Sequence, residues 1–145
     1  MGKCLYLLFL IIGGKMNDII KIWDSEKGHK CIIKKISHDA DMLGSMMSGM
    51  FATMGQGISS GKYHCGYVAV GKSSKLFGIF YDDINDKIDV HGGLTYSQLD
   101  GSKTFWIFGF DCAHYGDNIE TQDLDFCVKE CESLSRQLFN LEAEE

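Results

Sequence analysis

The sequence lacks proline altogether and contains a single arginine, Arg136, among its 145 residues. Without proline, slow X-Pro isomerisation is removed as a step that could limit folding. Twenty acidic residues outnumber fourteen basic ones and give a formal net charge of −6. Proteins that hold long nucleic acid need a basic stripe to neutralise phosphates, so this composition argues against DNA or long RNA as a ligand. A small nucleotide is still compatible with it, because backbone N–H groups and a few lysines can hold one or two phosphates.

The six cysteines also lack a pattern, since no two of them have the CxxC spacing of a structural zinc site. They lie within apolar segments, and the chain is longer than a typical disulfide-stapled domain. We therefore expect reduced, buried thiols in a cytosolic protein.

The chain begins with a short apolar run, Cys4–Ile12, that partly imitates the core of a signal peptide. The run is too short to cross a bilayer as a helix, so no membrane association is expected. The following Gly-Gly-Lys lacks a small-residue cleavage pattern. We interpret residues 1–15 as an apolar leader whose place in the mature protein is open, with a packed strand or a secretion signal as alternatives. Residues 16–145 then form a single α+β domain.

Short runs rich in β-branched and aromatic residues predict strands at Cys31–Ile36, Tyr63–Val70, Lys75–Tyr81, Lys87–Ser97 and Lys103–Phe110. Apolar residues at helical spacing from Leu124 to Leu141 predict a C-terminal amphipathic helix, with Thr121 as its cap. The expected fold class is α+β, an antiparallel sheet of about four or five strands with two helices packed on one face.

The second expected helix is rich in methionine and lies between Asp39 and Gly61. Its methionines recur every four residues and form one stripe, namely Met42, Met46, Met50 and Met54. The stripe either packs on the core or offers an adaptable apolar surface to a partner. A homo-oligomer formed through this Met-rich segment is one hypothesis.

The segment GFDCAHYGD, Gly109–Asp117, places reactive side chains directly after a buried strand. Asp111, His114 and Asp117 are three residues apart, a spacing that brings them to one side of a helical turn or tight loop. Loops held by a rigid scaffold are where such groups are both exposed and positioned. Cys112 is a weaker candidate for a nucleophile, because strand alternation turns it toward the core.

A second cluster, DVHGGLTY, spans Asp89–Tyr96. Alternation puts Asp89 and His91 on one face of the expected strand, and the double glycine Gly92-Gly93 indicates a bulge or a close backbone approach. If the two segments are neighbouring antiparallel strands, His91 meets the Asp111 and His114 loop at one end of the sheet. Two imidazoles and two carboxylates then converge.

Such a group supports three kinds of chemistry. His91 and His114 can act as acid and base on a phosphodiester, with Asp111 beside them, because imidazole exchanges protons near neutral pH. Alternatively, a divalent metal such as zinc or manganese binds the mixed N/O donors of His91, Asp111, His114 and Asp117. In the third case the site only recognises a ligand, through the aromatic and backbone groups of Gly92, Gly93, Thr95, Tyr96 and Asp117.

A purely structural role is the competing interpretation. An aspartate after a strand often caps a turn, Gly116-Asp117 is a common turn pair, and a lone histidine is usually a hydrogen-bonded core residue. The coincidence of both clusters, with a double glycine beside one histidine, favours a functional pocket.

Two of these motifs, HGGLTY and GFDCAHYGD, resemble a family of small proteins encoded by tailed bacteriophages and prophages. The segments GYVAV at 66–70 and YDD at 81–83 extend the likeness over roughly residues 63–138. Gly71 stands where this family has proline, and the first sixty residues are not covered. The resemblance implies a phage accessory protein that acts in the cytoplasm of the infected bacterial host, outside the virion.

The resemblance and the residues together lead to one function hypothesis and two rivals. The first is a counter-defence protein that binds and hydrolyses a cyclic or ADP-ribose-type nucleotide immune signal, as a phosphodiesterase-like enzyme with a His/Asp pocket. The second is a non-catalytic sponge that sequesters such a nucleotide. The third is a protein-binding inhibitor of a host factor, for which the Met stripe would matter more than the histidines.

Overall fold

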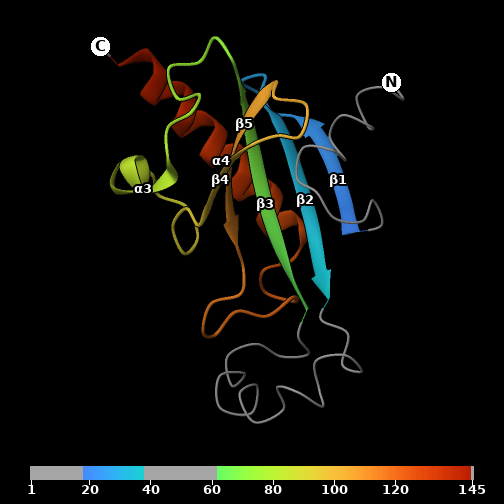
Figure 1. Ribbon diagram of the computed structural model, residues 1–145. Coiled ribbons are helices and arrows are strands. Elements are labelled where there is room, and N and C mark those ends of the chain that lie inside the picture. Colours follow the sequence, from blue (N-terminus) through green and yellow to red (C-terminus); the bar gives the residue numbers. More distant parts are fainter. Residues whose placement is uncertain (1–17, 38–61, 145) are drawn as a thin grey trace, which may run out of the picture.

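The computed structural model describes residues 18–37 and 62–144 and contains a five-stranded sheet (Figure 1). Its strands run in the order β1-β2-β3-β5-β4, and every neighbouring pair is antiparallel. Their bounds are Ile19–Asp24 for β1, Lys30–Ser37 for β2, Lys62–Gly71 for β3, Tyr96–Leu99 for β4 and Phe105–Asp111 for β5. The expected α+β fold with an antiparallel sheet is confirmed.

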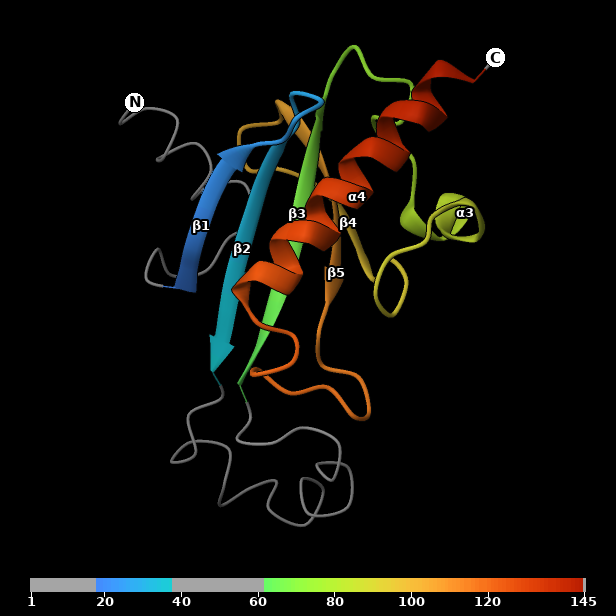
Figure 2. The same cartoon turned by 180° about the vertical axis from the view of Figure 1, so that it is seen from behind.

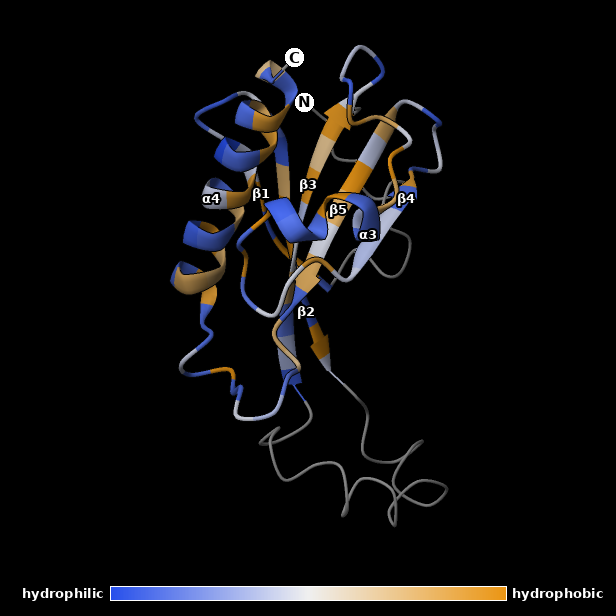
Figure 3. Ribbon diagram, turned by 90° about the vertical axis from the view of Figure 1, so that its left-hand side faces the viewer, coloured by the Kyte–Doolittle hydropathy of each residue, from blue (hydrophilic) through white to orange (hydrophobic). Residues whose placement is uncertain are grey.

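The predicted C-terminal helix is present as α4, Leu124–Ala143, and crosses one face of the sheet (Figure 2). Its apolar stripe is buried against the strands, with Cys127, Cys131, Leu134 and Leu138 fully enclosed. Figure 3 shows this apolar side of α4 turned toward the sheet. Asp123, not Thr121, caps the helix, since its carboxylate accepts the Phe126 N–H at 2.9 Å.

Strand alternation divides the sheet into two faces. Val68 and Val70 of β3 belong to the core under α4. Ala69, between them, lies on the opposite face in a second apolar cluster with Ile32 and Ile107. Both faces therefore carry apolar side chains, which explains why β3 and β5 have almost continuous apolar sequences instead of alternating ones.

Two expectations about the strands were wrong, and one strand was missed. Lys75–Tyr81 is not a strand, because Gly78 has a φ of +86° and the segment turns before the short helix α3, Tyr81–Ile84. Lys87–Ser97 is extended only at its end, since a one-turn 3-10 helix, η3 (Asn85–Lys87), and the following loop replace most of it. The edge strand β1 was not predicted at all.

Two expectations lie outside the described residues, namely the apolar leader at 1–15 and the Met-rich helix with its proposed oligomer surface. Within residues 18–37 and 62–144, no helix combines the length and the apolar character needed to cross a membrane.

Candidate functional site

The two predicted motifs meet at one end of the sheet. The first motif leads into β4 and the second begins in β5, and these strands pair with Tyr96 opposite Gly109. This register brings the loops at their ends together, so that the ring centroids of His91 and His114 are 5.8 Å apart. Both loops lie on the same side of the sheet in Figures 1 and 2. The expected convergence of the motifs is confirmed.

The double glycine makes room for a histidine. Gly92 and Gly93 have φ values of +70° and +80°, a region that disfavours other residues. A Cβ on Gly92 would lie 2.1 Å from His114 Nε2, so only glycine permits the ring to approach this closely. The Gly93 N–H donates to the Val90 carbonyl at 2.8 Å. It is therefore not available to a phosphate, contrary to the expectation that Gly93 presents its N–H to the ligand.

Asp117 joins the two loops. Its side chain is buried, and both carboxylate oxygens lie 2.9 Å from His91 Nε2. The backbone N–H of His114 also donates to Oδ2 of Asp117 at 2.9 Å. These internal partners occupy the carboxylate, so Asp117 connects the two loops. The expectation that Asp117 binds the ligand is therefore not supported by its contacts.

His91 is held on the α4 side of this joint. Its backbone N–H donates to Oε1 of Glu130 at 2.8 Å, and its ring packs edge-on against Phe126 with centroids 5.2 Å apart. Both partners belong to α4. The imidazole is thus fixed by a helix on one side and by Asp117 on the other.

His114 forms the second histidine–carboxylate pair, with Asp111. Its Nε2 lies 3.3 Å from Oδ1 of Asp111, within ion-pair distance. This nitrogen is shielded from solvent and the contact lacks the alignment of a hydrogen bond, so Nε2 is a buried polar atom without a hydrogen-bond partner. The His114 side chain as a whole is 38% exposed. Buried polar atoms of this kind are rare and often mark functional positions.

The four residues expected to bind metal instead pair with one another. His91 pairs with Asp117, and His114 pairs with Asp111. In the described part of the chain no group of three or more His, Cys, Asp or Glu side chains is arranged to hold a metal ion. The donor geometry therefore does not fit the metal-site hypothesis, although all four side chains lie in one region.

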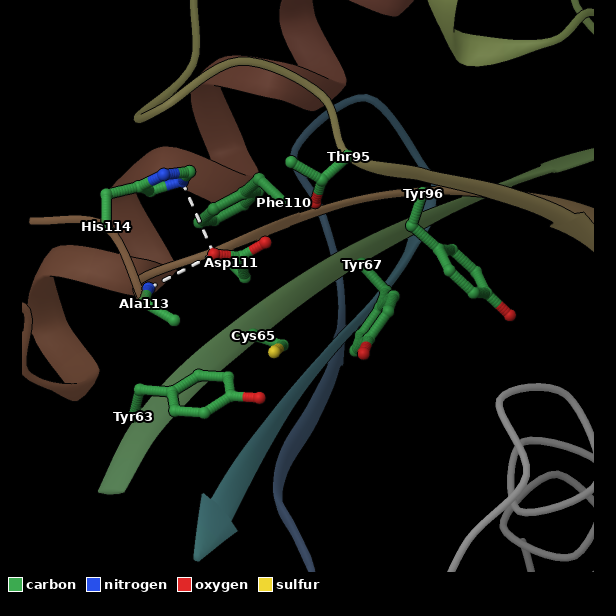
Figure 4. Close-up of a pocket in the computed structure, with 9 residues that line it drawn as sticks. All are labelled: Tyr63, Cys65, Tyr67, Thr95, Tyr96, Phe110, Asp111, Ala113 and His114. Carbon is green, nitrogen blue, oxygen red and sulfur yellow. Dashed lines mark hydrogen bonds and ion pairs between the residues drawn. The ribbon is translucent and has the colours of Figure 1, made fainter. Parts of the chain in front are cut away.

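A hollow of about 500 Å³ opens beside the second pair, on the face of the sheet opposite α4 (Figure 4). It is lined by residues from β3, β4, β5 and the two loops, namely Tyr63, Cys65, Tyr67, Thr95, Tyr96, Phe110, Asp111, Ala113 and His114. Four predicted site residues line this hollow: Thr95, Tyr96, Asp111 and His114. The other four predicted residues, His91, Gly92, Gly93 and Asp117, do not line it, although His91, Gly92 and Asp117 each lie against His114.

Sequence reasoning missed the β3 wall of the hollow. Tyr63, Cys65 and Tyr67 alternate along the strand and all face the hollow in Figure 4. Their period of two was visible in the sequence YHCGY. Only the pairing of β3 with β5, which puts Cys65 opposite Asp111, shows that this face belongs to the site.

Cys112 is not placed to act as a nucleophile. Its side chain is buried, with its sulfur 3.7 Å from that of Cys127 on α4. The hydrogen bond between the two thiols, together with burial, raises the pKa of Cys112 far above its usual range. The thiolate needed for attack is therefore not formed at neutral pH.

Comparison of the chain with protein-family models, with curated proteins and with solved structures found no match. The function is therefore inferred from the geometry of the site and from the motifs themselves.

Proposed function

We propose that this protein binds a small cyclic or ADP-ribose-type nucleotide in the hollow and hydrolyses it, acting as a phage counter-defence protein in the cytoplasm of the infected host. The observation that carries the proposal is the Asp111–His114 pair, with 3.3 Å between His114 Nε2 and Asp111 Oδ1, at the edge of a 500 Å³ hollow lined by three tyrosines. Ligand pockets for small molecules usually have volumes of roughly 300–1,000 Å³.

His114 supplies the proton transfer in this proposal. A water molecule attacks phosphorus and gives its proton to the imidazole, while the bond between phosphorus and the leaving ribose oxygen breaks. The leaving oxygen then takes the proton back from the imidazolium. Asp111 orients the ring and stabilises the imidazolium, as a carboxylate does beside a catalytic histidine.

His91 has a positioning role, which differs from the two-histidine mechanism expected from the sequence. It does not line the hollow, and its Nε2 is occupied by Asp117. Asp117 in turn accepts the His114 N–H, so His91 acts on the reaction through the placement of His114. Replacing His91 by Asn should lower kcat more than it raises KM, and a His91→Gln variant, whose longer amide can reach Asp117, should recover part of the loss.

Sequestration without hydrolysis is the second candidate. The observation in its favour is that only one of the two imidazoles lines the hollow, so no second side chain of that type faces His114 across the ligand. A site with one imidazole can still bind the nucleotide without accelerating cleavage of its phosphodiester bond.

One experiment separates the candidates. Purified protein is incubated with a panel of cyclic dinucleotides and cyclic ADP-ribose isomers, and the mixture is analysed by mass spectrometry before and after heat denaturation. New products that disappear with His114→Ala and persist with Tyr115→Ala support hydrolysis, since Tyr115 is the exposed neighbour outside the hollow. Unchanged nucleotide released by heat supports sequestration. If no nucleotide is bound or changed, both candidates are rejected.

A further inference from the structure

The floor of the hollow is an aromatic row that crosses three strands. Tyr67 of β3, Gly109 of β5 and Tyr96 of β4 lie directly opposite one another. A Cβ on Gly109 would lie 2.7 Å from the Tyr67 ring, so the ring leans over the glycine. The two tyrosine rings meet edge to face, with centroids 5.5 Å apart and an angle of 82° between their planes. Figure 4 shows both rings on the side of the hollow away from His114.

The charge of the hollow is unsuited to phosphate. Among the described residues that line it, none is lysine or arginine. Burial raises the pKa of Cys65 to about 12 and also raises the pKa values of Tyr67 and Tyr96, so these groups stay neutral. Lys34 of β2 lies opposite Cys65 in the sheet register and is itself buried.

The polar groups of the hollow can accept hydrogen bonds from a ligand. Oδ1 of Asp111 already accepts the Ala113 N–H at 3.1 Å, while Oδ2 has no hydrogen-bond partner among the described residues. An ionised carboxylate is an acceptor only, so it selects ligand groups that carry N–H or O–H. Thr95 adds a hydroxyl at the same edge.

From this arrangement we propose that the hollow holds the uncharged nucleoside part of the ligand, with the base against Tyr67 and Tyr96 and its N–H or ribose O–H donors on Asp111. Phosphate groups then remain at the mouth beside His114. This assignment rests on the proposed function because it concerns the same site. It is a statement about binding, however, and does not require hydrolysis. Aromatic side chains contribute to base binding through stacking, which every base supports.

The test is titration calorimetry with separate probes for the two halves of a nucleotide. Adenosine, guanosine, cytidine and uridine are compared with adenosine 5′-monophosphate, ribose 5-phosphate and inorganic phosphate. We expect at least one nucleoside to bind within about tenfold of the Kd of the monophosphate, and neither ribose 5-phosphate nor phosphate to bind comparably.

Variants then locate the binding. Tyr96→Ala should weaken nucleoside binding by about tenfold, whereas Tyr96→Phe, which keeps the ring, and Tyr115→Ala, outside the hollow, should leave it unchanged. Asp111→Asn should also weaken it, since an amide replaces part of the acceptor capacity. Urea unfolding of each variant checks that the fold is intact, and Asp111→Asn, which keeps the size of the side chain and is expected to weaken binding, keeps the test decisive if Tyr96→Ala unfolds.

The inference is overturned if no nucleoside binds, if the phosphate probes bind as well as the nucleosides, or if Tyr96→Ala binds normally. Hydrolysis of a cyclic nucleotide without nucleoside affinity would remove this inference and leave the proposed function standing. Nucleoside affinity without binding or turnover of any nucleotide in the panel would reject the proposed function and leave this inference standing.

Discussion

Substituting Gly92 by alanine is the most direct perturbation of the candidate site. The new Cβ would lie 2.1 Å from Nε2, 2.5 Å from Cδ2 and 2.8 Å from Cε1 of His114. Ordinary contacts begin at 3.4 Å, so the ring or the turn has to retreat by about 1.3 Å, the difference between these distances. A retreat of that size takes His114 away from the 3.3 Å contact with Asp111.

Two costs add up in this variant. The left-handed backbone at Gly92 costs a non-glycine residue about 1–2 kcal/mol. Forcing the imidazole out of its place adds about 1–3 kcal/mol, as overpacking does elsewhere. If the proposed function holds, a displacement near 1 Å should also lower turnover by about a hundredfold.

A matched control separates the two costs. Gly28 has a φ of +89° and no atom within 4 Å of its built Cβ, so Gly28→Ala carries only the backbone cost. Urea unfolding of both variants measures the difference, and the Cε1–H resonance of His114 in NMR spectra reports the ring. Equal losses of stability in the two variants, with an unmoved His114 resonance, would refute the close packing of His114 on Gly92.

Three further predictions concern stability and are checked by urea unfolding. Burial opposes ionisation of Asp100, but the Ser102 hydroxyl and the backbone N–H groups of Ser102, Thr104 and Phe105 donate to the carboxylate, outweigh burial and hold the pKa of this carboxyl below its ordinary value. Its contribution is therefore present above about pH 4 and lost as the pH falls further, so Asp100→Asn should cost about 2 kcal/mol at pH 7 and much less near pH 3; an unchanged difference at both pH values would contradict this. Leu134→Ala, at a fully buried position under the sheet, should cost about 3 kcal/mol, and a loss below about 1 kcal/mol would contradict the packing described. Lys103→Gly should stabilise the β4–β5 turn by up to about 1 kcal/mol, because Lys103 has a φ of +61°; a lower unfolding midpoint would show that the lysine makes a compensating contact.

The fold was predictable wherever a local pattern coincided with burial. The stripe from Leu124 to Leu138 predicted α4 because the helix buries one face and exposes the other. β2 and β3 were predicted because they are rich in β-branched and aromatic residues. Lys75–Tyr81 failed for the opposite reason: Leu76 and Ile79 are apolar because they pack on the core from a turn, which composition does not distinguish from a strand.

The sequence predicted which residues belong to the site better than it predicted what each of them does. The spacing of Asp111, His114 and Asp117 indicated one loop, and the register of β4 on β5 brings His91 to it. Which histidine faces the hollow depends on how the loops pack on α4 through Glu130 and Phe126, and no local pattern encodes such contacts. The tyrosines of β3 were missed because their partner strand is distant in sequence.

The cysteines of this protein amount to built-in reporters of local opening. All five in the described residues are buried and free: Cys31, Cys65, Cys112, Cys127 and Cys131. A thiol reagent can reach Cys112 and Cys127 only when their surroundings separate, whereas Cys65 lines the hollow, so modification rates resolved by peptide mass measure separate events. The modification rate of Cys65 reports access to the β3 wall of the hollow, beside Tyr63 and Tyr67. The rates of Cys112 and Cys127 report the separation of β5 from α4. A ligand bound against the β3 wall would therefore slow the modification of Cys65. The modification rates of Cys112 and Cys127 would still depend only on how often α4 separates from β5.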